Sequence, residues 1–359
     1  MDDYPNEPGD EEYIDLARRH IIDLIDREHA VVWHEVEARL AEVAVPGAEK
    51  GINPHFLTNA RRQLLDEGVI EVVTATARGG REIAVYGLLD RRRRKTAFER
   101  AAGRKRLLET RYLGWAGGSV ETNAIGSAGE LVTHVSLQRA ASEAIGYRVL
   151  STGGQVRQLF GANIPGGPID NAALLIGDNI AAPRIFTIMV EVKNLRPWLY
   201  PPAVEIYQLL HKAAQVQIQQ PNQHIMPVLV ARRVHYLTFV MAKHLGFFIV
   251  QFDGCAQPIR ELEFVDPHFV DEIRDELGYN LVLTDGTGFE RIYRAFRYTI
   301  PRYAQPTAER WARMGPDLAP HFARLRNRNL TARDRDQATD LLYRDAVRIA
   351  TPRPRWRTV

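Results

Sequence analysis

"FTIMVEVKNLRP", residues 186–197, is the stretch of this sequence that decides the fold. Apolar and β-branched residues run from Phe186 to Val190, a composition typical of a strand that is buried on both faces of a sheet. The strand then ends in Glu191 and Lys193, which are two residues apart. Alternate side chains of a strand share one face, so this carboxylate and this ammonium project to the same side. The stretch therefore predicts a buried strand that ends at a charged pair.

The segments around this strand alternate between helical and strand patterns. A helical pattern precedes it at 127–146, and apolar strand patterns occupy 147–152, 169–176 and 185–193. The alternation continues downstream, with expected helices at 203–219 and 235–246 and expected strands at 226–233 and 247–252. Helices between short, almost continuously apolar strands predict an α/β fold whose sheet is covered on both faces.

The charged residues of these strands have the chemistry of a metal site. A strand that pairs antiparallel with 185–193 could bring Asp170 to the side of Glu191 and Lys193. Two carboxylates supply the oxygen ligands that Mg²⁺ (or Mn²⁺) prefers, and a neighbouring lysine can orient a water or stabilise negative charge. Asp178 is the competing ligand, although Gly177-Asp178-Asn179 is a turn signal. These residues predict a site for metal-assisted hydrolysis of phosphodiester bonds.

The order of these residues resembles the restriction-endonuclease-like superfamily, with its PD-(D/E)XK signature, over about residues 126–252. In that family a helical glutamate precedes a strand aspartate, an acid-X-lysine triplet follows on the next strand, and the next helix often carries a glutamine. The family's Pro-Asp pair is replaced here by "GPID" (167–170). The resemblance implies a mixed-sheet core flanked by helices, acting as a Mg²⁺-dependent DNA endonuclease, with Asp170 and Glu191 as metal ligands. It implies these catalytic residues: Glu130, Asp170, Glu191, Lys193 and Gln208, with Gln215 as the alternative to Gln208.

The N-terminal part of the chain has a different pattern. Helical patterns at 11–28, 31–43 and 53–68 are followed by two β-prone runs, 69–76 and 81–89, around a glycine turn. Three helices and a hairpin resemble a winged helix-turn-helix domain, in which the third helix enters the major groove and the hairpin lies on the backbone. The alternative use of such a domain is protein contact. The resemblance implies these DNA-binding residues: His55, Thr58, Asn59, Arg61, Arg62, Arg78 and Arg81.

Charge is unevenly distributed, although the net charge is only +3. Residues 91–113 hold ten basic residues against two glutamates, and residues 302–359 hold thirteen arginines against six acids. Such blocks predict surfaces for a polyanion, although each could also be a solvated helical face. Helices are expected at 267–277, 288–297, 306–314 and 331–349. The predicted organisation is a winged helix domain (11–89), a basic helical linker (90–125), a nuclease-like core (126–260) and an arginine-rich, mostly helical region (261–359).

Bulk composition limits the remaining possibilities. A chain of 359 residues is long enough for two domains with their own cores. Cys255 is its one cysteine, which excludes a disulfide framework and fits the reducing cytoplasm where we expect the protein. The acidic start has no signal-peptide pattern, and no apolar run approaches the roughly 20 residues that span a membrane.

The sequence therefore predicts a DNA endonuclease of restriction or defence type, with duplex DNA as its partner. A winged helix joined to this nuclease core also occurs in Mrr-type methyl-directed restriction enzymes. Those enzymes commonly carry Gln-X-Lys where this chain has Glu-X-Lys, so a modified-DNA substrate is not implied. Two rivals remain open: a non-catalytic DNA-binding regulator that keeps a nuclease fold, and a repair or mobile-element nuclease. A homodimer also remains open.

Overall fold

The computed structural model describes residues 10–77, 80–89, 95–117, 122–151, 155–177 and 184–350. The chain forms two compact units, each built from two separate segments. Unit 1 comprises Met1–Ala124 and Arg260–Leu283, and unit 2 comprises Ile125–Ile259 and Thr284–Val359. The chain leaves unit 2 within β11 (Gln257–Arg260) and re-enters it within β12 (Leu281–Thr284). None of the described helices is both long enough and apolar enough to cross a membrane.

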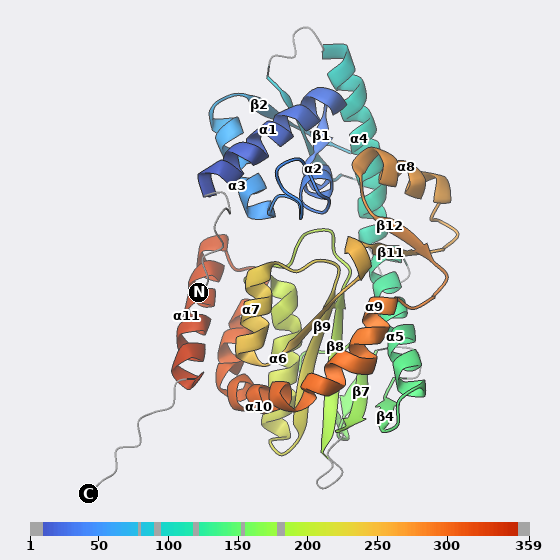
Figure 1. The fold of residues 1–359 in the computed structure, drawn as a ribbon, viewed down its shortest axis with the longest axis vertical. Helices are drawn as coiled ribbons and strands as arrows, with labels where there is room; N and C mark the ends of the chain where they lie inside the picture. The colour runs from blue at the N-terminus through green and yellow to red at the C-terminus, as the bar shows by residue number, and fades with distance from the viewer. Residues whose placement is uncertain are drawn as a thin grey trace, which may run out of the picture. The chain divides into compact units, whose positions relative to one another are not determined.

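The N-terminal segment of unit 1 is a group of helices on a three-stranded antiparallel sheet (Figure 1). The sheet order is β1-β3-β2, and Asn53 caps the third helix by accepting a hydrogen bond of 3.0 Å from the His55 backbone N–H. Residues 31–43 were expected to be one helix, but Val31 and Val32 pair with β3 instead, because β-branched residues favour a strand. The elements are α1 (Asp10–Glu28), β1 (Val31–Val32), α2 (Trp33–Leu40), α3 (Pro54–Asp66), β2 (Ile70–Thr76) and β3 (Glu82–Leu88).

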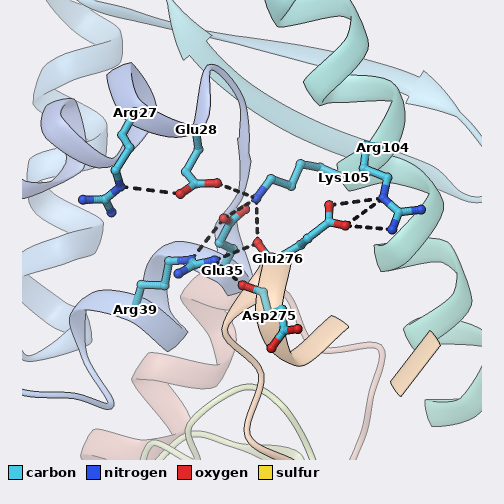
Figure 2. A network of polar contacts seen from close by, with 8 residues as sticks. All are labelled: Arg27, Glu28, Glu35, Arg39, Arg104, Lys105, Asp275 and Glu276. Atoms are coloured by element: carbon cyan, nitrogen blue, oxygen red, sulfur yellow. Dashed lines mark hydrogen bonds and ion pairs between the residues drawn. The ribbon is translucent and has the colours of Figure 1, made fainter. Parts of the chain in front are cut away.

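Unit 1 is completed by α4 (Lys95–Ala116) and by α8 (Pro267–Leu277) from the second segment. The four arginines 91–94 of the expected basic helix, like Arg78 and Asp178, lie outside the described residues. At the centre of the unit the Lys105 ammonium donates to Glu35 (2.6 Å), Glu28 (3.2 Å) and the Glu276 carbonyl (2.6 Å) (Figure 2). We call Glu28, Glu35, Arg39, Lys105 and Glu276 the buried charge network, because Glu35 and Lys105 at its centre are buried; the other three side chains are partly exposed.

The buried charge network joins the two segments of unit 1. Arg39 donates to the backbone carbonyls of Asp275 and Glu276, both at 2.9 Å, and Arg104 forms a forked ion pair with the Glu276 carboxylate (Figure 2). A second link is the Tyr279 hydroxyl, which donates to Glu109 at 2.6 Å. The segment Arg260–Leu283 is therefore bound to the N-terminal segment by hydrogen bonds to charged groups, the stronger class of hydrogen bond.

We expect the stability of unit 1 to fall as the pH rises from about 4.5 to about 7. Burial raises the pKa of Glu35 to about 7, and Lys105 and Arg39 offset only part of that effect. One carboxylate oxygen of Glu35 is buried and has no hydrogen-bond partner among the described residues. The folded state therefore binds this proton more tightly than the unfolded state, and the stabilisation is lost as the proton leaves. Roughly 2–3 kcal/mol of unfolding free energy should disappear over this window.

The measurement is urea unfolding between pH 4.5 and 8, with Glu35→Gln as the matched variant. The amide of this variant cannot titrate, so the fall attributed to Glu35 should be absent. Glu28 acts in a different window, because Lys105, against the effect of burial, lowers the pKa of Glu28 below its usual value. If the free energy of unfolding fell equally with pH in the parent protein and in Glu35→Gln, the assignment to Glu35 would be contradicted.

Among the described residues of unit 2, five strands form one mixed sheet in the order β10-β9-β8-β7-β4. β8 pairs parallel with β9 and antiparallel with β7, and β10 pairs parallel with β9. The α/β prediction is confirmed at this level, and β8 has the predicted bounds. The strands are β4 (Tyr147–Val149), β7 (Asn171–Ile176), β8 (Ile185–Lys193), β9 (His224–Ala231) and β10 (Phe248–Gln251), and β5 (Gln158–Leu159) and β6 (Ala162–Asn163) form a separate small hairpin.

Helices cover both faces of this sheet (Figure 1). One face packs against α6 (Val204–Gln219), α7 (Tyr236–Leu245) and α10 (Ile300–Leu325), with α11 (Ala332–Ala350) packed on α10. The other face packs against α5 (Ala124–Ser142), α9 (Glu290–Arg294) and the first turns of α10. A short 3₁₀ turn, η1 (Asp253–Cys255), follows β10.

The C-terminal helices differ most from the prediction. Residues 288–297 and 306–314 were expected to be two short helices, but helical structure runs from Glu290 to Leu325 through α9, η2 (Ala295–Thr299) and α10. Proline disfavours a helix interior, yet α10 contains three prolines there. Buried side chains at helical spacing, among them Trp311, Leu318 and Phe322, anchor the helix to the core and outweigh the lost hydrogen bonds.

Candidate active site

The register of β7 and β8 sets Asp170 against Glu191. Asn171 is paired with Val190, so continuing the antiparallel register by one residue places Asp170 opposite Glu191. The backbone N–H of Val192 donates to the Asp170 carboxylate at 2.6 Å, which holds that side chain at the end of β8. The sequence argument for bringing these two carboxylates together thus agrees with the observed pairing.

Glu191 is held between two ammonium groups. It is 4% exposed, and its two carboxylate oxygens accept hydrogen bonds from Lys193 (2.8 Å) and Lys212 (2.9 Å). Lys212 comes from α6 and also donates to the Pro168 carbonyl at 2.5 Å, two residues before Asp170. The alternation along β8 places Glu191 and Lys193 on the face covered by α6, so this helix can supply the second cation.

Glu130 approaches from α5, and the approach depends on its neighbour Gly129. A Cβ at Gly129 would lie 2.7 Å from the Cβ of Asn194, too close for any real side chain. Asn194, directly after β8, donates to the Ile125 carbonyl at 2.6 Å and to the Pro258 carbonyl at 2.8 Å. The first turns of α5 are therefore held against the end of β8, which brings Glu130 within electrostatic reach of Glu191 and Lys193.

The charges of this cluster act strongly on one another. Burial, followed by the negative charges of Glu191 and Glu130, raises the pKa of Asp170 to about 7. Burial and Glu191 also raise the pKa of Glu130, against the effect of Lys193. Although burial opposes it, Glu191 and Asp170 raise the pKa of Lys193, so its ammonium stays charged at neutral pH. The site therefore combines Lys193, which stays positively charged, with the carboxyl groups of Asp170 and Glu130, whose pKa values are raised.

The donor set fits a hard cation. Carboxylate oxygens are the ligands that Mg²⁺ takes in proteins, usually from one or two side chains, with waters and substrate phosphates completing its shell. Asp170 is half-buried, accepts one backbone N–H and faces two other carboxylates, so a cation beside it would relieve the repulsion that adds to the effect of burial on its pKa. Within the described residues, no group of three or more His, Cys, Asp or Glu side chains could hold a metal. A metal here would therefore rest on the pair Asp170 and Glu191.

The α6 side chain that reaches Glu191 is Lys212, one turn beyond Gln208. The prediction of Gln208, with Gln215 as the alternative, followed the family pattern. Lys212 was missed, although the sequence contains a signal for it. Glu205, Gln208 and Lys212 form a polar stripe at helical spacing on a helix whose neighbouring positions are largely apolar and buried. Such a stripe indicates side chains directed at a polar site.

The residues predicted to bind DNA are mostly engaged within unit 1. Arg61 lies 4.3 Å from the centre of the Trp33 ring, and Arg81 donates to the Leu113 carbonyl at 2.6 Å. Thr58 donates to the carbonyl one turn earlier, and the side chains of His55 and Asn59 contact each other at 3.2 Å. His55 and Arg62 are exposed on the surface of α3. Of the predicted residues that the structure describes, we expect these two to be the best placed to contact a ligand.

No protein-family model, curated protein or solved structure matches the chain. What the site can do is therefore argued from its own contacts, in which carboxylates from α5, β8 and the residue before β7 meet lysines from β8 and α6.

Proposed function

We propose that this protein is a metal-dependent nuclease that hydrolyses phosphodiester bonds in DNA. The observation that carries the proposal is the pairing of β7 with β8, which sets Asp170 opposite Glu191 while Lys193 donates to Glu191. The mixed sheet with helices on both faces supports a restriction-endonuclease-like core. A role in restriction or defence is the biological setting that we favour.

Each residue of the site has a distinct part in the proposed reaction. A bound Mg²⁺ would neutralise the phosphate and make its water a better nucleophile. Lys193 remains a cation, so it can donate to a phosphate oxygen or orient the attacking water. Asp170 and Glu191 would hold the metal, and Glu130 adds negative charge beside them. Lys212 positions Glu191 and the loop before Asp170 through its two hydrogen bonds.

The arrangement of unit 1 supports DNA docking by a winged helix. Unit 1 has the element order helix, strand, helix, helix, strand, strand and a three-stranded antiparallel sheet, which is consistent with a winged helix-turn-helix domain. In that domain α3 is the helix that enters the major groove. His55 and Arg62 on the exposed face of α3 would then meet DNA.

The test of the function is cleavage of supercoiled plasmid by the full chain. With Mg²⁺ or Mn²⁺ we expect nicked or linear product, and with EDTA we expect none. Several plasmids, prepared both with and without methylation, cover the substrate alternatives. Absence of cleavage on all of them, with either metal, would contradict a nuclease function.

We expect Arg62→Ala to weaken duplex binding about three- to tenfold and to lower the salt dependence of binding by about one ion. Arg62 is exposed, so this loss would come from a phosphate contact rather than from unfolding. Fluorescence anisotropy at several salt concentrations measures both quantities, with exposed Arg19→Ala on α1 as the matched control. Unchanged affinity would move the DNA surface to the hairpin, α4 or the arginine-rich C-terminal helices.

A second candidate is the DNA-binding regulator without turnover. It is favoured by one observation: both oxygens of Glu191 are already bound by lysines. Such a carboxylate could be a structural ion pair in the core rather than a metal ligand. This candidate predicts duplex binding with no cleavage under any metal condition, which the plasmid assay separates from the nuclease.

A further inference from the structure

A cavity lies at the opposite end of the unit 2 sheet from the candidate active site. Its volume is about 850 Å³, which is within the range of small-molecule binding pockets. The cavity lies beside the end of β7 and the start of β8, and Ile176 and Arg184 are among the residues that line it. Asp170 is six residues from Ile176 along the chain, a rise of about 20 Å in a strand. The two sites are therefore separate.

The cavity has a cationic wall. Arg184, Arg297 and Arg302 line it, and among the described lining residues the one acid is Glu143. Glu143 is already engaged, because it accepts hydrogen bonds from the Tyr293 hydroxyl and from Arg139. Arg184 forms an ion pair of 2.7 Å with Glu309. Arg297 and Arg302 are thus the cations best placed to meet an anionic ligand.

Apart from Gln305, which donates to Glu309, the rest of the lining is apolar or aromatic. Tyr147 and Phe186 are mostly buried, whereas Tyr298 is 56% exposed. An exposed aromatic ring beside arginines offers a stacking surface next to an anion site. Such a ring can stack on a flat group of a ligand.

The backbone that presents these groups is unusual. Arg297 and Tyr298 belong to η2, where the helix widens and the Ile300 N–H bonds to the Ala295 carbonyl five residues earlier. Wide turns of this kind are rare within helices and are frequent at functional sites. Here the wide turn carries a cation and the exposed ring into one cavity.

From these features we infer that the cavity binds a nucleoside phosphate. Arg297 and Arg302 take the phosphate through charge-assisted hydrogen bonds, the geometry for which guanidinium is suited. The base lies against Tyr298 and the apolar wall. The volume is large enough for a nucleotide and far larger than a lone phosphate needs. The proposal does not depend on nuclease activity.

The test is isothermal titration calorimetry of the full chain with the four nucleoside 5′-monophosphates, in EDTA. We expect saturable binding of at least one of them, and much weaker binding of adenosine or inorganic phosphate alone. Arg297→Ala and Arg302→Ala should each lower the affinity about tenfold or more. Exposed Arg294→Ala, on α9 and outside the cavity lining, is the matched control and should bind like the parent.

Several results would overturn the inference. One is no saturable binding of any monophosphate at millimolar concentration by parent protein that is folded by circular dichroism. Another is binding that Arg297→Ala and Arg302→Ala leave unchanged. If inorganic phosphate bound as tightly as the nucleoside monophosphates, the inference that the cavity recognises a nucleoside would be wrong. Asp170→Ala should bind the nucleotide normally, and loss of binding in that variant would place the ligand at the other site.

Discussion

Lys193→Ala and Asp170→Ala should each reduce Mg²⁺-dependent plasmid cleavage by roughly a thousandfold, without weakening DNA binding. Removing one preorganised electrostatic group from an active site typically lowers the rate by about 10²–10³. Asp170→Ala also removes one of two proposed metal ligands, so its effect should be at least as large. DNA affinity should be unchanged, because our proposal assigns DNA binding to unit 1 and to the arginine-rich surfaces. The rate comes from gel densitometry and the affinity from anisotropy.

Matched substitutions separate this loss from general damage. Lys243 and Asp317 are exposed in unit 2, on α7 and α10, so Lys243→Ala and Asp317→Ala should cleave at the parent rate. Circular dichroism should show the same fold for all four variants. Cleavage that survives both Asp170→Ala and Lys193→Ala would mean that the active site lies elsewhere.

Lys105→Ala should destabilise the protein by about 3–5 kcal/mol, the usual effect of removing one partner from a buried ion pair. Lys105 is 4% exposed and Glu35 is fully buried, and they meet at 2.6 Å (Figure 2). Without the ammonium, Glu35 and Glu28 would lose their shared cation, and the Glu276 carbonyl would lose a donor. Urea unfolding followed by circular dichroism measures the change.

The control for this prediction is Lys95→Ala on the same helix. Lys95 is exposed and its contact with Glu99 is 3.9 Å long, so it should change stability by less than about 0.5 kcal/mol. The double variant Lys105→Ala/Glu35→Gln should be more stable than Lys105→Ala alone. It removes the Glu35 carboxylate together with the Lys105 ammonium, so no unpaired charge is left at that position. A loss in Lys105→Ala no larger than that in Lys95→Ala would show that the network contributes little.

The fold of unit 2 was largely predictable because its strands carry local signals. β8 has the bounds that its apolar pattern and end residues indicate, and the same holds for α8 of unit 1. α10 was not predictable in the same way. Proline is a local signal against a helix, whereas the burial of Trp311 and Phe322 depends on residues far away in the sequence.

The same distinction applies to the candidate site. Asp170, Glu191 and Lys193 could be placed together because strand alternation and antiparallel pairing are regular. Lys212 could not be preferred to Gln208, because the rotation of a helix above a sheet is set by packing. Glu35 and Lys105 are 70 residues apart in the sequence, so no local or periodic pattern predicts that they pair.

The division of unit 1 into two segments has a consequence for synthesis on the ribosome. Its last segment, Arg260–Leu283, is translated after most of unit 2, a delay of roughly 10–30 s at ordinary elongation rates. During that delay Arg104 has no Glu276 to pair with, and Tyr112 lacks the Tyr279 ring that packs against it at 5.0 Å. A nascent chain that ends before α8 should therefore be sensitive to protease at α4, and the sensitivity should vanish once residue 283 has emerged.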